Sequence, residues 1–204
     1  KLINESKKPL IVWGQGVILG NAESEFKDFV EKTGIPAAWT ILGVSAISTN
    51  HKLNVGMVGM HGNYGPNVLT NDCDLLIAIG MRFDDRVTGD LKTYAKQAQI
   101  IHFEIDPAEV DKNVKVDIAV IGNVKQTLKE ILTHVNKSSH NSWVRKFREL
   151  NKIEFDKVID KEYNKQSGGL SMAEVIKSIN ENTDGNSILA VSYTHLRAHE
   201  TVAN

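Results

Sequence analysis

A run of five consecutive apolar residues, from Leu75 to Ile79, constrains the fold more than any other stretch of this sequence. The run has no alternation of polar and apolar side chains, so a strand formed by it must be covered on both faces, as in parallel sheets. Gly80 follows it directly, and a polar segment long enough for a short helix precedes it. We interpret this order as loop, short helix, buried strand and functional loop. Four glycines punctuate the first loop: Gly56, Gly59, Gly62 and Gly65.

Similar apolar runs recur on either side and are separated by helix-patterned or glycine-rich connections. We count six between Lys8 and Val135, and they predict an α/β fold with a doubly wound, six-stranded parallel sheet, Rossmann-like, with helices on both faces. Residues 47–55 are largely polar, and we expect an irregular surface segment there. The runs to which we assign strand bounds are Pro9–Trp13, Ile35–Thr40, Leu75–Ile79, Ile100–Asp106 and Asp117–Gly122.

Helices are expected between these strands. Asn21 is predicted to cap a helix that ends at Gly34, and residues 91–99 have apolar positions spaced for one helix face. Asn123 is predicted to cap the helix that follows the last strand, with Gln126 placed to reach back to it. The buried stripe of that helix is expected to contain Val124, Leu128, Ile131, Leu132 and Val135.

The composition changes near residue 136, where a polar, serine-rich segment marks a domain edge. A long amphipathic helix is predicted over residues 142–163, and Ser171 is predicted to open a further helix with a capping box. A short strand is expected over residues 188–191. We divide the chain into a Rossmann-like domain (1–136), a linker with the long helix (137–169), the start of a second domain (170–192) and a tail (193–204).

Composition excludes several classes of function. A formal net charge of −1 gives no general field for nucleic acid or an anionic membrane, so anion binding would need a local group of cations. No apolar run approaches the roughly 20 residues that a membrane helix needs. The single cysteine, Cys73, precedes a buried strand and is expected to be a packing residue. Without an internal disulfide or a signal-like start, we predict a cytoplasmic protein.

The turn after the central strand carries two arginines and two aspartates, Arg82, Asp84, Asp85 and Arg86. Ligands of open parallel sheets collect just beyond the carboxyl ends of the strands, so the arginines would stand where an anion is expected. Guanidinium groups offer forked donors to a pyrophosphate, and the aspartates could orient them. The same pattern also fits a solvated ion-pair cluster that contributes little to stability. His61 likewise has a structural interpretation, in which it bonds to backbone groups of its glycine-rich loop.

The first strand is followed by three closely spaced glycines, Gly14, Gly16 and Gly20. They approach the dinucleotide fingerprint GxGxxG, but the third glycine falls one residue late. A nicotinamide site and a tight strand-to-helix turn without a ligand both remain open from the pattern alone. Glu104 stands at the carboxyl end of a strand, where an acid commonly accepts hydrogen bonds from ribose hydroxyls.

Two segments resemble one enzyme family. Gly59-Met60-His61-Gly62 and Arg82-Phe83-Asp84-Asp85-Arg86-Val87-Thr88-Gly89 are similar to the central, FAD-binding domain of the acetolactate synthase (acetohydroxyacid synthase) large subunit. The similarity extends from about Lys8 to about Ser192. It implies a domain that holds FAD, a flavin that takes no net part in turnover. The residues implied to contact FAD are Gly14, Gly16, Thr40, Ile41, Leu42, Gly59, Met60, His61, Gly80, Met81, Arg82, Asp84, Asp85, Arg86, Val87, Glu104, Ile105, Gly122, Asn123 and Val124.

The resemblance also implies the chemistry of a larger enzyme. Such a transferase joins two 2-ketoacids, pyruvate with pyruvate or 2-ketobutyrate, after decarboxylation on thiamine diphosphate and Mg²⁺, in branched-chain amino-acid biosynthesis. Its implied partners are the remaining domains of the same subunit, further copies in a homo-oligomer and a small regulatory subunit. The activating glutamate and the Gly-Asp-Gly motif of the family are not in these 204 residues, since Thr183 precedes Asp184-Gly185. We therefore expect the chain alone to be inactive and assign no catalytic or metal-binding residue.

Two other interpretations stay open. The chain could be the central domain of a related thiamine-diphosphate decarboxylase or oxidase, of the oxalyl-coenzyme A or pyruvate oxidase type, or a stand-alone nucleotide-binding module without catalysis. Residues 170–192 resemble the start of the family's thiamine-diphosphate-binding domain, and beyond Ser192 the resemblance stops. His195 and His199 have the spacing of a helical metal pair, but no second motif completes a site. We interpret residues 193–204 as a tail that does not belong to the natural protein.

Overall fold

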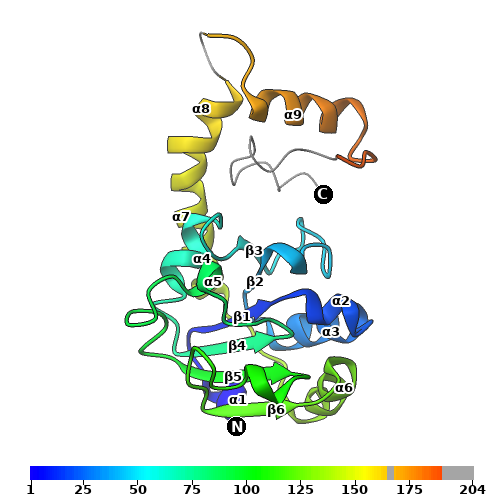
Figure 1. Cartoon of the computed structure of the whole chain (residues 1–204), viewed down its shortest axis with the longest axis vertical. Coiled ribbons are helices and arrows are strands. Elements are labelled where there is room, and N and C mark those ends of the chain that lie inside the picture. The colour runs from blue at the N-terminus through cyan, green and yellow to red at the C-terminus, as the bar shows by residue number, and fades with distance from the viewer. Residues whose placement is uncertain (165–167, 190–204) are drawn as a thin grey trace.

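A six-stranded, all-parallel sheet forms the centre of the computed structural model, which describes residues 1–164 and 168–189 (Figure 1). The strand order is β3-β2-β1-β4-β5-β6, so the chain builds one half outward from β1 and then returns to build the other half from β4. The predicted doubly wound parallel sheet is thereby confirmed. The strands are β1 (Pro9–Trp13), β2 (Ala37–Trp39), β3 (Asn54–Met57), β4 (Leu75–Ile79), β5 (Gln99–Glu104) and β6 (Ile118–Ile121).

The two central strands are fully buried, as their apolar sequences require. β1 and β4 pair from Pro9 opposite Leu75 to Trp13 opposite Ile79, and every residue of both strands is buried. β6 lies at one edge of the sheet and is largely exposed. The burial of the sheet therefore declines from its centre toward β6.

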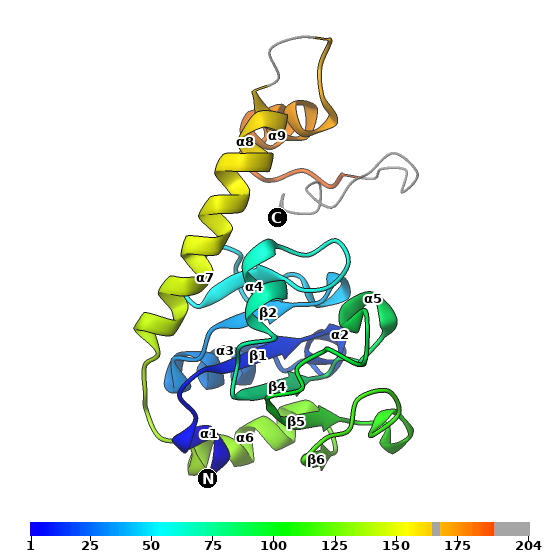
Figure 2. The ribbon, with the colours of Figure 1, turned by 90° about the vertical axis from the view of Figure 1, so that its left-hand side faces the viewer.

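Helices cover both faces of the sheet (Figure 2). On one face, α3 (Glu23–Thr33) and α6 (Val124–His134) bury their apolar stripes against alternate residues of the strands, including Ile11 and Ile77. On the other face, α4 (Tyr64–Leu69) and α7 (Asn141–Glu154) pack against the intervening residues. The shorter elements are α1 (Leu2–Glu5), α2 (Gln15–Leu19), η1 (Ile41–Gly43), α5 (Asp85–Thr88) and η2 (Pro107–Glu109).

Several predicted helix boundaries are confirmed. Gly34 ends α3 in the left-handed conformation with φ 63°, which glycine adopts without steric cost. The Asn123 side chain accepts a hydrogen bond from the backbone N–H of Lys125 and so caps α6. In the predicted stripe of α6, Val124 and Leu128 are buried, Ile131 and Leu132 are only partly buried, and Val135 is buried just beyond the end of the helix. Ser171 forms the predicted capping box with Glu174.

Four local predictions are wrong. We expected an irregular segment and a glycine loop where β3 lies. The strand was missed because its four residues are only partly apolar. The turn predicted after β1 is instead the short helix α2. Asn21 does not cap α3: its φ is 47°, and the cap position is Ala22. In the predicted helix 91–99, residues 91–97 form turns and Gln99 already begins β5, and Ala95 has a φ of 47°.

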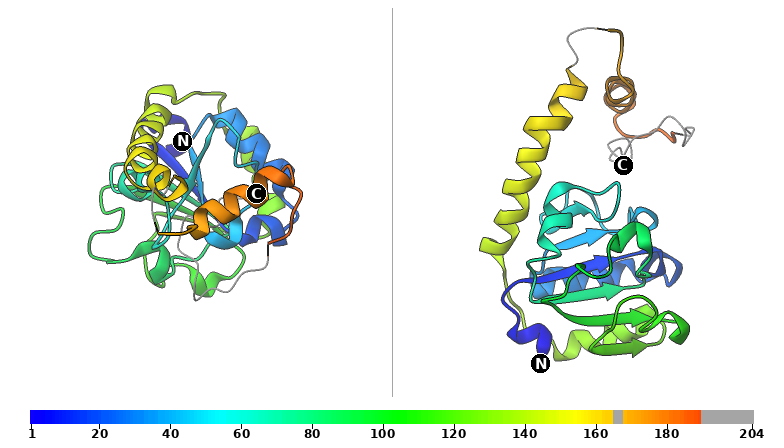
Figure 3. Two further views of the ribbon diagram at one scale, coloured as in Figure 1. Left: turned by 90° about the horizontal axis from the view of Figure 1, so that it is seen from above. Right: turned by 60° about the vertical axis from the view of Figure 1, so that its left-hand side comes forward.

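The predicted long helical segment is present, and it leaves the sheet (Figure 3). α7 continues through a π-helical turn, Phe155–Ile159, into α8 (Asp160–Tyr163), and α9 (Met172–Asn182) packs near α8. The first half of the segment is docked, with Trp143 and Phe147 buried. At the end of α7, Glu154 also bonds to the domain, since its Oε2 accepts from the Asn63 side chain and the Tyr64 backbone at 3.2 and 3.0 Å.

The last predicted elements are only partly described. Ile188 and Leu189 are not in a strand, while the remaining two residues of the strand predicted over 188–191 lie outside the described residues. His195, His199 and the rest of the predicted tail (193–204) also lie outside them.

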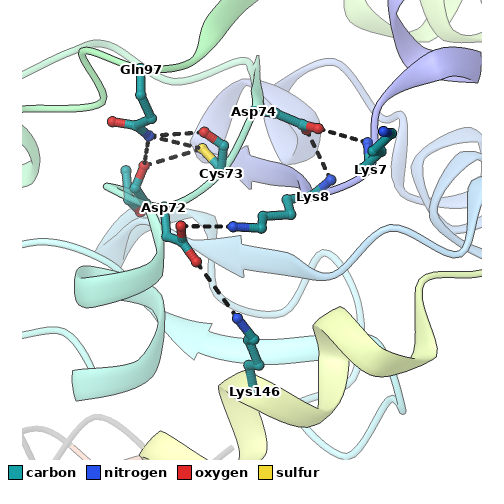
Figure 4. Close-up of polar contacts among 8 residues, drawn as sticks. Lys7, Lys8, Asp72, Cys73, Asp74, Gln97 and Lys146 are labelled. Carbon is teal, nitrogen blue, oxygen red and sulfur yellow. Dashed lines mark hydrogen bonds and ion pairs between the residues drawn. The ribbon is translucent and has the colours of Figure 1, made fainter.

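Two neighbouring aspartates tie the amino ends of β1 and β4 together (Figure 4). Asp74 accepts hydrogen bonds from the backbone N–H groups of Lys7 and Lys8 at 2.7 and 3.0 Å. Asp72 pairs with the Lys8 ammonium at 2.8 Å and with Lys146 of α7 at 3.9 Å. Cys73 between them is buried, as predicted, and burial raises the pKa of its thiol to about 12, so it is a packing residue rather than a nucleophile.

The two aspartates are expected to differ in their contribution to stability. Asp74→Ala leaves two backbone N–H groups without their charged acceptor and should lower the free energy of unfolding by about 1.5–3 kcal/mol. Asp72→Ala removes only half-exposed ion pairs and should cost about 0–1 kcal/mol. Urea unfolding of both variants measures the difference. Equal losses would show that the backbone bonds to Asp74 do not secure this edge.

Candidate functional site

The loops that follow the six strands meet at the carboxyl edge of the sheet. In a doubly wound sheet the ligand crevice forms where the chain reverses its direction of strand addition, which here is between β1 and β4. All the site residues predicted from the sequence follow or end a strand at this edge or begin the next helix. The topology therefore brings them to one side of the sheet, although they span residues 14 to 124.

The turn after β1 and the turn after β4 are packed backbone to backbone. Gly14 and Gly16 donate hydrogen bonds to Ile79 and Gly80 carbonyls at 3.0 and 2.9 Å. A Cβ placed on Gly14 would lie 2.6 Å from the Gly80 carbonyl oxygen, and one on Gly16 would lie 2.6 Å from the Gly80 Cα. These glycines are therefore required by close packing within the protein. Their contact with a ligand remains a prediction.

The two segments that carry the family resemblance lie against each other. The backbone N–H of Met60 donates to the Arg86 carbonyl at 2.7 Å, so the loop after β3 rests on α5. The Asn67 side chain holds the same loop, since its amide both donates to and accepts from Gly59 at 2.8 Å. This joins the predicted residues Met60 and Arg86 into one structural unit. Asn67 was missed because an asparagine inside a short helix has no distinctive sequence signal.

The charged turn after β4 is ordered by Asp84. Its side chain accepts from the backbone N–H of Arg86 at 3.0 Å and caps α5. This backbone bond, followed by a side-chain bond to Asp85, holds the pKa of the Asp84 carboxyl below its usual value. Arg82 lies 3.7 Å from the Asp84 carboxylate, with 64% of its side chain exposed. Both Arg82 and Arg86 therefore present guanidinium groups to solvent at the edge of the sheet.

Large apolar side chains are exposed around the same edge. Met60 is 71% exposed and Leu42 is 61% exposed, although each follows a strand that is itself buried or half-buried. Leu19, at the end of α2, is also exposed and was missed because α2 was interpreted as a turn. Such a set of apolar groups beside cations suits a ligand that has flat rings and an anionic portion. Ile41 and Ile105 complete the set.

A buried polar pair supports the loop after β5. Glu104 is buried, and its Oε1 accepts from the backbone N–H groups of Ile105 and Asp106 at 2.8 and 3.2 Å. Its Oε2 lies 3.6 Å from Nε2 of His102, which donates to the Met81 carbonyl at 2.8 Å. Glu104 therefore orders its own loop at the position predicted for a ribose contact, which itself remains a prediction. His102 was missed because it lies inside an apolar strand.

The remaining predicted residues have structural roles at the two outer parts of the edge. Asn123 caps α6, and Val124 is buried against α2, where it would touch a Cβ on Gly20 at 2.6 Å. Thr40 donates its backbone N–H to the Trp13 carbonyl at 2.9 Å and so closes β2 onto β1. His61 and Asp85 are exposed, and Val87 and Gly122 are half-buried. The ligand contacts of these residues remain predictions.

Two other kinds of site are absent from residues 1–164 and 168–189. Within these ranges no three histidine, cysteine, aspartate or glutamate side chains are grouped so that they could hold a metal ion. No helix there is long and apolar enough to span a membrane.

Comparison with known proteins shows which family this domain resembles in sequence. Residues 1–131 match the family described as the thiamine pyrophosphate enzyme, central domain. The matched region contains all six strands and every residue of the candidate site. It thus agrees with the resemblance noted from the two sequence segments.

Several curated proteins are similar to the chain over a longer range. The probable acetolactate synthase large subunit of Methanococcus aeolicus is 47% identical over 136 residues, 67% of this chain and 23% of that protein. That of Methanocaldococcus jannaschii is 42% identical over 156 residues, 75% of this chain and 26% of that protein. The acetolactate synthase large subunit of Buchnera aphidicola is 35% identical over 193 residues, 93% of this chain and 33% of that protein. The chain spans about a quarter to a third of the length of these relatives.

Proposed function

The chain belongs to the family of thiamine pyrophosphate enzyme central domains, and from this premise we propose that it is the FAD-binding part of an acetolactate synthase large subunit. The proposal is supported by relatives of that name that are 35–47% identical to it. The whole enzyme would join two 2-ketoacids, pyruvate with pyruvate or with 2-ketobutyrate. This would place the protein in branched-chain amino-acid biosynthesis.

The observation that carries the flavin assignment is the composition of the carboxyl edge. Exposed apolar side chains such as Leu42 and Met60 surround the point between β1 and β4 where doubly wound sheets bind nucleotides. An isoalloxazine ring needs such a surface, because its flat faces gain little from water. Arg82 and Arg86 are exposed beside it and would offer forked donors to the pyrophosphate of FAD. The residues present therefore fit FAD in both its apolar and its anionic parts.

The role of the flavin in this domain would be structural. FAD would fill the carboxyl edge, cover apolar groups and neutralise the two arginines, without net oxidation or reduction during turnover. On this proposal the residues of the chain bind and orient the flavin, and none of them transfers a proton to substrate. Glu104 and Asn123 would lie toward the adenosine side, since Glu104 ends β5 and Asn123 follows β6 on one half of the sheet.

The rest of the enzyme would supply the chemistry. Thiamine diphosphate and Mg²⁺ would be held by other domains of the same subunit, and a homo-oligomer with a small regulatory subunit would complete a cytoplasmic assembly. The activating glutamate and the Gly-Asp-Gly motif expected for those cofactors are not in this sequence. The chain on its own is therefore expected to form no acetolactate, since binding alone cannot replace a catalytic group in the transition state.

Binding of FAD to the chain tests the proposal. A flavin site that lacks covering domains should be weak, and with a dissociation constant of roughly 100 µM, about 1 mM FAD would stabilise the fold by roughly 1.4 kcal/mol. For a chain of this size the melting temperature should rise by roughly 3–6 °C, measured by scanning calorimetry. No rise at this concentration would contradict the flavin assignment.

An arginine variant locates the site. Arg86→Ala should abolish most of the rise with FAD and leave the ligand-free melting temperature within about 1–2 °C, because an exposed arginine contributes little to the fold. Lys96→Ala is the matched control, since it removes an exposed cation near the amino end of β5. An equal loss in both variants would indicate general charge attraction instead of a flavin site after β4.

A further inference from the structure

A pocket lies at the amino edge of the sheet, opposite to the candidate flavin site. Its volume is about 530 Å³, and its lining includes Gly34, Leu53 and the first turns of α7. Gly34 comes before β2 and Leu53 comes before β3, whereas the loops of the candidate flavin site come after these strands. The pocket is therefore distinct from the flavin site and independent of that assignment.

The charged side chains that line this pocket are strongly unbalanced. Four are cationic, Lys52, Lys137, Arg145 and Arg148, and one is acidic, Glu31. Glu31 is already engaged, because its Oε1 lies 3.2 Å from Nε2 of His51. Within residues 1–164 and 168–189 none of the four cations takes part in an ion pair. A chain with a formal net charge of −1 thus concentrates an excess of positive charge in one hollow.

The walls of this pocket are held by hydrogen bonds within the protein. Ser138 donates its backbone N–H to the Lys32 carbonyl at 3.0 Å and its hydroxyl to the Thr33 carbonyl at 2.6 Å. Gly34 packs against the same segment, since a Cβ on it would lie 2.5 Å from the Ser138 carbonyl oxygen. Arg148 donates to the Lys52 carbonyl at 2.9 Å, which joins α7 to the loop before β3. Because the backbone of this pocket is ordered before binding, the protein loses little backbone conformational entropy when a ligand binds.

We propose that this pocket binds a small anion carrying two or more phosphate groups. Its volume lies within the range of small-molecule sites, and guanidinium groups such as those of Arg145 and Arg148 match phosphate oxygens in geometry. Several cations around one hollow favour a ligand that carries several charges. The apolar lining residues Leu53 and Val144 are only 7% and 6% exposed, so they offer no anchor to a protein partner, which argues against an acidic peptide.

Calorimetric titration with inorganic tripolyphosphate at constant ionic strength tests the proposal. We expect saturable binding of about one tripolyphosphate per chain, and binding at least about tenfold weaker in the double variant Lys137→Ala/Arg145→Ala. The double variant Lys157→Ala/Lys161→Ala is the matched control, because it removes two exposed cations from the far end of the same helical segment. It should bind tripolyphosphate as the parent does.

Three results would overturn the proposal. These are the absence of saturable binding, an equal weakening in the two double variants, and displacement of tripolyphosphate by a polyglutamate peptide that binds more tightly. The last result would assign the pocket to an acidic protein segment. Arg86→Ala should leave tripolyphosphate binding unchanged, so the outcome is separable from the FAD experiment. All variants change exposed side chains, and circular dichroism confirms that they remain folded.

Discussion

Replacing Phe147 by alanine should lower the free energy of unfolding by about 3–5 kcal/mol. Phe147 is 0% exposed, and its ring meets that of Trp143 edge to face at 5.1 Å between centroids. The side chain fastens α7 to the face of the sheet that α4 also covers. Because domains of this kind are stable by only about 5–15 kcal/mol, the loss should be visible as a large shift of the urea midpoint. Tryptophan fluorescence would report it directly through Trp143.

Phe155 provides the matched control for this substitution. It lies on the same helical segment, eight positions further along, and is 44% exposed. Phe155→Ala should change the free energy of unfolding by no more than about 0.5 kcal/mol. If both phenylalanines cost the same, α7 would not be part of the cooperative core, and the boundary between its docked and free halves would be wrong.

The substitution Gly80→Ala should be at least as damaging, with an expected loss of about 3–5 kcal/mol from backbone strain and overpacking together. Gly80 has a φ of 57°, which an alanine adopts only at a cost. The new Cβ would lie 2.8 Å from backbone atoms of Gly16 and 2.9 Å from the Val17 nitrogen. Backbone atoms cannot rotate away, so the turns after β1 and β4 would have to separate. Urea unfolding measures the loss.

Substitutions at two other glycines separate the contribution of steric overpacking from that of backbone strain. Gly14→Ala adds only a clash, because its φ of −129° is ordinary but a Cβ would lie 2.6 Å from the Gly80 carbonyl oxygen. Gly89→Ala adds only strain, about 1–3 kcal/mol, because its φ is 58° and no heavy atom lies within 4 Å of the new Cβ. Gly80→Ala should exceed both. A loss at Gly80 no larger than at Gly89 would mean that the two turns separate easily.

The centre of the fold could be predicted from sequence because its signals are redundant. The uninterrupted run of Leu75–Ile79 requires a strand covered on both faces, and β4 indeed lies in the middle of the sheet. Gly34 and Asn123 are stop and start signals whose chemistry depends only on neighbouring residues, and both act as predicted. That the predicted site residues lie at one edge followed from the same logic, since loops after parallel strands share an edge.

Elements that depend on distant contacts could not be predicted. β3 has few apolar residues and forms because β2 is already present to pair with it. α2 begins at a glycine pair that resembles a turn until the loop after β4 packs against it. His102 acquires its role only when the Met81 carbonyl comes within 2.8 Å, although 21 positions separate the two residues. In each case the decisive partner is remote in sequence.

The length of the helical segment that leaves the sheet determines how far its end lies from the domain and in which direction it faces. Its π-helical turn begins at Phe155, directly after Glu154, which bonds to Asn63 and Tyr64 of the domain. From there to Tyr163 the segment extends by roughly 13 Å at about 1.5 Å per residue. Deleting one residue between Phe155 and Tyr163 would shorten this stretch by about 1.5 Å and turn the end of α8 by about 100°. The length between Glu154 and Tyr163 therefore sets both the distance and the angular phase at which the end of α8 stands relative to the sheet.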